Sequence, residues 1–134
     1  MLTEKDYCDY DTCVALKELG YIGQGRCYYN LDKDKNKLRH FGIQVLTTRS
    51  AEALNFVLAV HLYEAQKWLR EEKEIGIFVS GFKNGYVFWV NNILSVETLY
   101  QGFFNNQTGE KYKSYEEALL EGVRESIKLL EEEK

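Results

Sequence analysis

The side chains best suited to chemistry are few, and their spacing matches no catalytic or metal-binding pattern. Cys8, Cys13 and Cys27 form no C-x-x-C pair and are odd in number, which argues against a disulfide framework or a zinc site. The two histidines, His40 and His61, lie in no signature of a Ser/His or Cys/His nucleophile. A cation precedes Cys27 and could activate its thiol. Three reduced cysteines that behave as small hydrophobic residues are nevertheless expected.

The segment that starts at Asp32 opens like the calcium loop of an EF-hand. Its letters DKDKN offer oxygen ligands at the first, third and fifth positions. The sixth position is Lys37 where the loop needs glycine, and the twelfth is Ile43 where it needs glutamate. We therefore expect a solvated turn, no metal and no cofactor. Because the chain also lacks a Walker loop, G-x-G-x-x-G and H-E-x-x-H, a protein that is not an enzyme is predicted, with an unrecognised enzyme as the third hypothesis.

Charge is unevenly distributed along the chain. The net charge is −4, but residues 26–49 carry six basic side chains against two aspartates, and residues 114–134 carry seven glutamates against three basic side chains. Such a division creates a surface field that can steer a charged partner. Tyrosine beside lysine suits both protein contacts and base stacking. The candidate partner-contact surface is therefore Arg26, Tyr28, Lys33, Lys35, Lys37 and Arg39.

The first helix is predicted over residues 10–19. Asp9 precedes it as an N-cap, because its carboxylate can accept a hydrogen bond from a free N–H of the first turn. Gly20 follows where a left-handed residue ends a helix. Tyr21 can then contact Leu16, as a Schellman ending requires.

Residues 26–31 and 38–46 are predicted to form the strands of a basic hairpin, joined by a polar turn at residues 32–37. Residues 50–61 leave two alternatives open, a helix that continues into the next one or a strand at residues 56–60. We favour the helix, although its pattern is fully developed only from Leu62.

The stretch from residue 62 to 79 predicts an amphipathic helix that leads directly into a buried strand. Leu62, Ala65 and Leu69 recur at i, i+3 and i+7 and share one stripe, which Trp68 widens. We therefore predict that Trp68 and Leu69 anchor the core. The β-branched and aromatic residues that follow position 74 indicate the strand.

Asn84-Gly85 lies between two apolar runs and predicts a hairpin with a type I′ turn. In that register Phe82 faces Val87. A third strand is predicted at residues 97–104. Most of the aromatic side chains on these strands must be core, but strand alternation sends some outward, and the sequence does not say which.

The last helix is predicted to begin with a capping box, Ser114 to Glu117. Gly122 lies beside its apolar stripe and costs about 1 kcal/mol relative to alanine, so it is predicted to mark close packing on the sheet. The stripe itself consists of Leu119, Val123, Ile127 and Leu130.

These elements predict one α+β domain over residues 1–134, with three helices packed on an antiparallel sheet of about four to five strands made of two hairpins. From residue 62 to 130 the order is α-β-β-β-α, which is also the order of a double-stranded-RNA-binding domain. Such domains place lysines at the start of the last helix to bind phosphates. Here Glu116, Glu117 and Glu121 occupy that region and would repel a nucleic-acid backbone.

Three motifs occur together: DYC at residues 6–8 followed by LKELGY at 16–21, A-x-K-W-L-R-E at 65–71, and Y-E-x-A at 115–118. In this combination the chain resembles small uncharacterised proteins encoded by phages and prophage-like elements of Bacteroidales. The resemblance spans most of the chain and implies a phage or mobile-element context, with no activity and no site residue. Family members often carry Pro-Thr-Leu at residues 60–62, where this chain has VHL. The resemblance also implies a helix that begins near Leu62.

The leading hypothesis is a non-catalytic accessory or protein-interaction module of a phage or mobile element. The alternative is a nucleic-acid-binding module that uses the basic hairpin at residues 26–49. An unknown protein partner is expected, nucleic acid is not favoured, and a homo-oligomer is left open. The polar, acidic start MLTEKDYCDY differs from a signal peptide, and no apolar run is long enough to cross a membrane. We therefore expect a cytoplasmic protein with no membrane partner.

Overall fold

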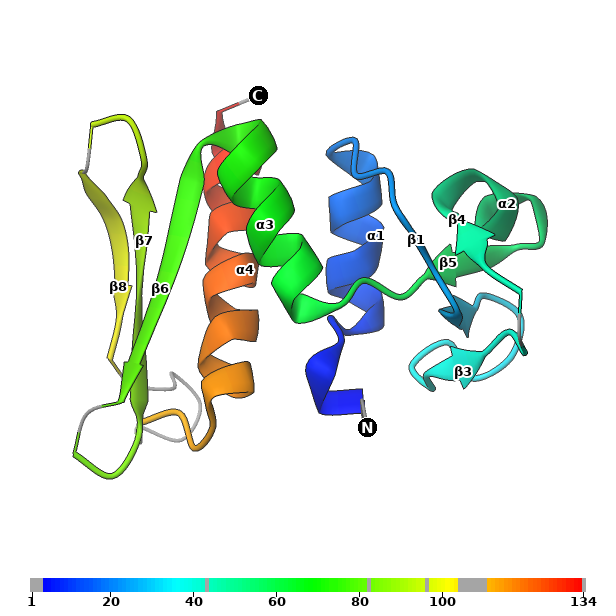
Figure 1. Cartoon of the computed structure of the whole chain (residues 1–134), viewed down its shortest axis with the longest axis horizontal. Helices are drawn as coiled ribbons and strands as arrows, with labels where there is room; N and C mark the ends of the chain where they lie inside the picture. The colour runs from blue at the N-terminus through cyan, green and yellow to red at the C-terminus, as the bar shows by residue number, and fades with distance from the viewer. Residues whose placement is uncertain (1–3, 43, 82, 96, 104–110, 134) are drawn as a thin grey trace. The chain divides into compact units, whose positions relative to one another are not determined.

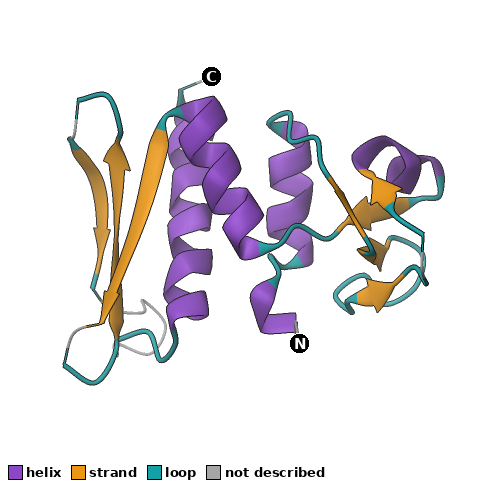
Figure 2. Ribbon diagram, in the orientation of Figure 1, coloured by secondary structure: helices purple, strands orange, loops and turns teal. Residues whose placement is uncertain are grey.

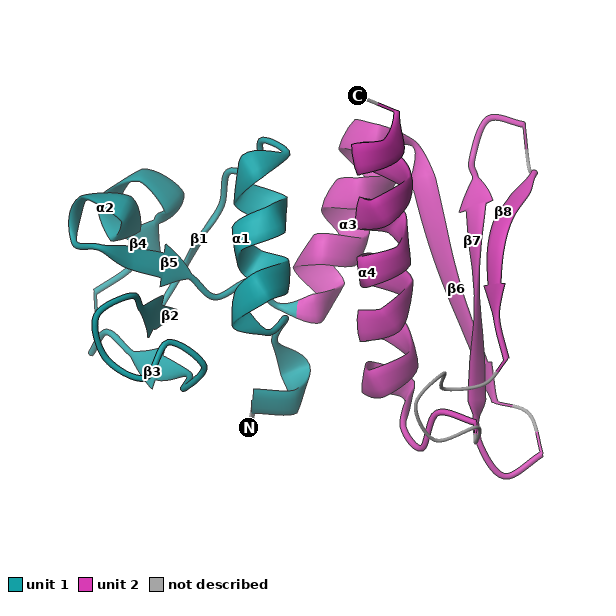
Figure 3. Ribbon diagram, turned by 180° about the vertical axis from the view of Figure 1, so that it is seen from behind, with its two compact units in different colours: residues 1–61 teal, residues 62–134 magenta. Residues whose placement is uncertain are grey.

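The computed structural model describes residues 4–42, 44–81, 83–95, 97–103 and 111–133, and the chain forms two compact units, Met1–His61 and Leu62–Lys134 (Figure 3). Both units contain helices and antiparallel strands (Figure 2), which confirms the predicted α+β class. The details differ from the prediction. The described residues form four α-helices and eight strands in three antiparallel sheets.

The elements of unit 1 are η1 (Glu4–Asp6), α1 (Tyr10–Glu18), β1 (Gln24–Gly25), β2 (Cys27–Asn30), β3 (Arg39–His40), β4 (Leu46–Thr47), α2 (Thr48–Ala53) and β5 (Phe56–Leu58). Those of unit 2 are α3 (Leu62–Lys73), β6 (Ile75–Gly81), β7 (Tyr86–Asn92), β8 (Thr98–Gly102) and α4 (Tyr115–Glu132).

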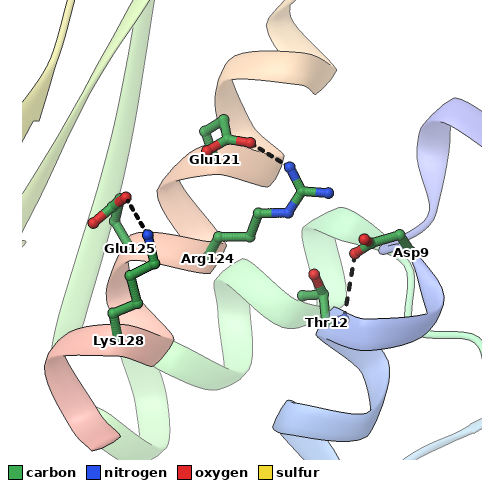
Figure 4. Close-up of polar contacts among 6 residues, drawn as sticks. All are labelled: Asp9, Thr12, Glu121, Arg124, Glu125 and Lys128. Carbon is green, nitrogen blue, oxygen red and sulfur yellow. Dashed lines mark hydrogen bonds and ion pairs between the residues drawn. The ribbon is translucent and has the colours of Figure 1, made fainter. Parts of the chain in front are cut away.

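Helix α1 begins at the predicted residue and ends one residue earlier than predicted, and both predicted end motifs are present. The Asp9 carboxylate accepts a hydrogen bond of 3.3 Å from Thr12 N (Figure 4). At the other end Gly20 has a φ of 104°, and Tyr21 N donates to Leu16 O at 2.9 Å. This is the Schellman geometry, in which a left-handed residue lets the chain satisfy carbonyls of the last turn.

Unit 1 contains two small sheets, one of strand order β3-β2-β5 and one that pairs β1 with β4. The predicted return strand at residues 38–46 is wrong, because its two ends pair with different partners. Between them Gly42 has a φ of 68°, a left-handed conformation that turns the chain away from β2. The predicted hairpin is therefore only a short pairing of β2 with β3, after which the chain continues to β4 in the second sheet.

The favoured helix over residues 50–61 is also wrong, and the strand alternative is correct in part. Helix α2 ends at Ala53, and Asn55 follows with a φ of 61°, a conformation that asparagine tolerates better than most residues. The chain then forms β5, which pairs with β2. Helix α3 begins at Leu62, as expected.

Unit 2 is an antiparallel sheet of order β6-β7-β8 with both of its helices on one face (Figure 1). Leu69 in α3 is fully buried, which confirms its predicted role in the core. Trp68 is only half-buried, and the Lys73 ammonium lies 5.4 Å from its ring centroid. Trp68 is thus a partly exposed side chain under a cation rather than a core anchor.

The β6–β7 hairpin has a register that differs from the prediction. Gly81 pairs with Tyr86, and Val87, which was predicted to face Phe82, pairs with Ser80. Phe82 itself lies outside the described residues. The turn is centred one residue earlier than expected, because Lys83 and Asn84 are the residues with positive φ, 36° and 66°. The observed register sets Ile77 against Val90 in the core, whereas the predicted one would set it against Asn92.

Helix α4 has the Ser114 half of the predicted capping box, since Glu117 N donates to Ser114 Oγ at 3.1 Å. The Glu117 carboxylate accepts a hydrogen bond from Lys113 N, at 3.3 Å, where the prediction paired it with Ser114 N. Its stripe residues Leu119, Val123 and Ile127 are buried, and Leu130 is half-buried. The i, i+3 ion pairs Glu121–Arg124 and Glu125–Lys128 lie on this helix (Figure 4).

Two glycines in unit 2 lie where a side chain would meet the core. A Cβ at Gly122 would lie 2.5 Å from Ile77 Cγ2, which confirms the predicted close packing of α4 on the sheet. A Cβ at Gly102 in β8 would overlap the ring of Phe88. In the described part of the chain, no helix has both the length and the apolar character needed to cross a bilayer.

Candidate functional site

The structure places Arg26 directly before β2, and the other five predicted contact residues in β2, in β3 and in the loop that joins them. Arg26, Lys33, Lys35 and Lys37 are exposed, whereas Tyr28 and Arg39 are half-buried. Arg39 Nη2 donates to Lys33 O at 3.4 Å, so these two residues lie together. The ammonium of Lys35 instead lies 5.2 Å from the centroid of the Tyr10 ring of α1.

The loop before β3 is held by two hydrogen bonds of Asp32 to asparagine side chains outside the loop. Asp32 N donates to Asn30 Oδ1 at 2.8 Å, and Asn55 Nδ2 donates to Asp32 Oδ2 at 2.9 Å. The first residue of the calcium-like sequence is therefore engaged in protein hydrogen bonds. Among the described residues, no three His, Cys, Asp or Glu side chains gather as a metal site would require.

An aromatic cluster covers one face of the β3-β2-β5 sheet. Tyr28 and Arg39 are register partners, so their side chains leave the same face. The Tyr28 ring stacks on Phe56 at a centroid distance of 4.1 Å, and Phe41 meets both rings edge-on, at 6.1 and 6.4 Å. The three rings are half-buried, and Arg39 leaves the same face of the sheet. Stacked rings on a face that also carries a cation provide a surface for planar ligands.

The opposite face of the same ladder brings Cys27 and His40 together, a pairing that the sequence analysis missed. They are register partners, and Cys27 Sγ lies 3.4 Å from His40 Nδ1. Cys27 Sγ also donates to Tyr7 Oη at 3.6 Å. Burial, and then the hydrogen bond to Cys27, raise the pKa of Tyr7 from 10.0 to about 12.

A thiol beside an imidazole is the atom pair of a cysteine nucleophile. Here the cysteine retains only 3% of its exposure, and reactive cysteines are usually partly exposed. The group therefore acts first as a packed polar cluster that ties Tyr7, the residue after η1, to β2 and β3. Only the correct strand register could have revealed it in the sequence.

The second surface that the sequence analysis missed is the sheet face of unit 2 that its helices leave uncovered. Phe78, Leu99 and Phe103 are 53%, 37% and 41% exposed. Trp89 is half-buried between them, and its ring meets that of Phe103 edge-on at 6.1 Å. We call these four residues the open face.

Strand alternation explains how the open face arises. Phe78 is the register partner of Trp89, which in turn pairs with Gln101, so all three leave the same side of the sheet. Ile77, Phe88 and Val90 leave the other side and are buried under the helices. The signal in the sequence is that both the odd-numbered and the even-numbered positions of β6 and β7 include apolar residues, so both faces of the sheet are apolar. The two helices of unit 2 cover only one of these faces.

Comparisons of the chain with protein-family models, with curated proteins and with solved structures find no match. No residue role is therefore transferred by homology, and the two surfaces rest on their own geometry.

Proposed function

We propose that the protein is a non-catalytic interaction module of a phage or mobile element, and that the open face of unit 2 binds an apolar surface of a protein partner. The exposed side chains of the open face carry this proposal. The phage context rests on the resemblance of the sequence motifs.

The composition of the open face fits protein recognition better than solvation. Three large apolar side chains, each at least 37% exposed, lie with a tryptophan on one sheet. Contiguous apolar patches on soluble proteins commonly mark interaction sites. Phenylalanine and tryptophan are enriched at such interfaces because they bury a large area and have few rotatable bonds.

A capture experiment tests this proposal. The intact chain and a variant with both Phe78→Ser and Phe103→Ser are used as baits in a lysate of the native host. A protein that binds the intact chain should be lost from the variant, and purified partner should bind the variant at least about tenfold more weakly. Circular dichroism verifies that the variant is folded.

The matched control carries Lys35→Glu and Lys37→Glu, which reverse charge on the basic loop of unit 1 and leave the open face intact. It should capture the same partner. A partner that still binds the serine variant but no longer binds the glutamate variant would overturn the assignment to the open face.

The second candidate function is nucleic-acid binding by the basic hairpin, favoured by the contact of Tyr28 with Phe56 on the face that also carries Arg39. Gel shifts with duplex DNA, single-stranded DNA and structured RNA test it. Lys35→Glu with Lys37→Glu should weaken binding about equally on all sequences, and Lys67→Glu on α3 is the control. We expect nothing tighter than about micromolar at physiological salt. A salt-sensitive nanomolar complex would place this candidate first.

A further inference from the structure

The edge of β6 lacks the charges, prolines and bulges that usually keep a sheet edge from pairing. Its sequence IGIFVSG contains no charged residue and no proline, and its seven residues pair with β7 without a register shift. Natural edge strands are usually protected by charges, prolines or bulges. The other edge strand, β8, has five residues, and its ladder has an irregularity at Val90/Asn91.

The backbone groups of β6 that face away from β7 follow from the alternation of the ladder. Ile93 N donates to Glu74 O, so residue 74 bonds toward β7. In an antiparallel pair, bonding residues alternate along the strand. Ile77, Val79 and Gly81 therefore present their N–H and C=O groups outward, and Gln66 Nε2 donates to the outward Ile77 O at 2.9 Å.

Only the second half of this edge is open. Ile75, Gly76 and Ile77 are buried, and the side chain of Gln66 lies across the backbone there. Phe78, Ser80 and Gly81 are exposed. Within the described residues, the only hydrogen bond to the outward groups of Val79 and Gly81 is one from Ser80 Oγ to Gly81 O, at 3.4 Å. A carbonyl oxygen has a second lone pair and can accept another donor.

We infer that β6 pairs antiparallel with β6 of a second copy of this chain, about a twofold axis at Ser80. This register places Val79 of one copy opposite Gly81 of the other, twice, so that the outward groups of these residues form four backbone hydrogen bonds. It joins two three-stranded sheets into one of six. The inference extends beyond the proposed function, because it concerns the sheet edge and not the open face.

A second copy is the occupant that fits the chemistry of this edge. A twofold pair needs only one surface that is complementary to itself. The uncharged strand sets no like charges against each other across the axis, although the whole chain carries −4. Selection of a foreign strand would need a charge or a pocket that rejects others, and β6 has no charged side chain with which to do so.

Ser80 provides a direct test because its side chain would meet its own copy at the axis. Directly opposite residues on neighbouring strands have Cβ atoms about 5 Å apart. Sedimentation of the purified intact chain from micromolar to millimolar concentration should reveal a dimer. Ser80→Lys and Ser80→Glu should each weaken dimerisation at least about tenfold, because each sets like charges together. An equimolar mixture of the two variants should restore the dimer.

Gln101→Lys and Gln101→Glu are the matched controls, at an exposed position on the opposite edge strand, and should leave dimerisation unchanged. A monomeric intact chain at every concentration would overturn the inference. So would a dimer that tolerates both Ser80 variants, or a mixture that stays monomeric while each variant is folded by circular dichroism. The experiment uses the purified chain alone, so its outcome is independent of whether a partner binds the open face.

Discussion

Gly122 in α4 lies directly against Ile77 in β6, so closely that a methyl group at position 122 would come 2.5 Å from Ile77 Cγ2. The helix tolerates a residue that weakens it because no other residue lets its backbone approach the sheet.

Gly122→Ala should therefore destabilise the protein. Alanine gains about 1 kcal/mol in helix propensity, whereas overpacking a tight core costs about 1–3 kcal/mol. The net loss should appear as a lower midpoint in urea unfolding. Combination with Ile77→Ala removes the clashing methyl, so the double variant should lose less than the sum of the single losses. Additive losses would show that the two residues do not compete for space.

Leu69→Ala should cost about 2–5 kcal/mol, because the side chain is fully buried in α3 and its removal leaves a cavity. Tyr63→Ala on the same helix removes a side chain that is 48% exposed and serves as the control. Thermal melts compare the two. Equal melting temperatures for the Leu69 variant and the intact chain would contradict the role of Leu69 in the core.

Asp9→Ala should lower stability by about 1 kcal/mol, because Thr12 N would lose its acceptor at the start of α1. The neighbouring Asp11→Ala retains this cap and removes only an acidic residue of the first turn, so its effect should be smaller. Chemical denaturation of both variants measures the difference. A larger loss for the Asp11 variant would contradict the role of Asp9 as the cap.

Stability should fall at alkaline pH as buried tyrosines ionise. Burial, and then the charge of Glu121, raise the pKa of Tyr112 from 10.0 to about 12. Between these values the unfolded chain releases the proton and the folded chain retains it, so the unfolded state gains stability as pH rises. Unfolding free energies measured across this window should decline with pH, and less so for Tyr112→Phe. The control, Tyr63→Phe, should keep the pH dependence of the intact chain. If Tyr112→Phe also kept the slope of unfolding free energy against pH, the role of Tyr112 would be contradicted.

Features set by neighbouring residues were predictable from the sequence. The cap at Asp9, the left-handed Gly20 and the start of α4 at Ser114 depend on side chains three or four positions apart, and each lies where expected. Helix α3 was also predictable, because its apolar stripe is read over consecutive turns.

Features that depend on residues far apart in the sequence were not predictable from it. Strand β5 exists because Phe56 to Leu58 meet β2, and no local pattern separates that pairing from a helix. The hairpin register depends on Ile77 meeting Val90 rather than on Asn84-Gly85 alone. The contact between Cys27 and His40, and the exposure of Phe78, both follow from registers and helix placement that the sequence does not state.

The contact of Gly102 with Phe88 limits which substitutions the two positions can accept during evolution. The ring of Phe88 fills the space that a side chain at position 102 would need, so neither position can change freely alone. In relatives of this chain, a larger residue at 102 should be accompanied by a smaller one at 88, and the two positions should vary as a pair.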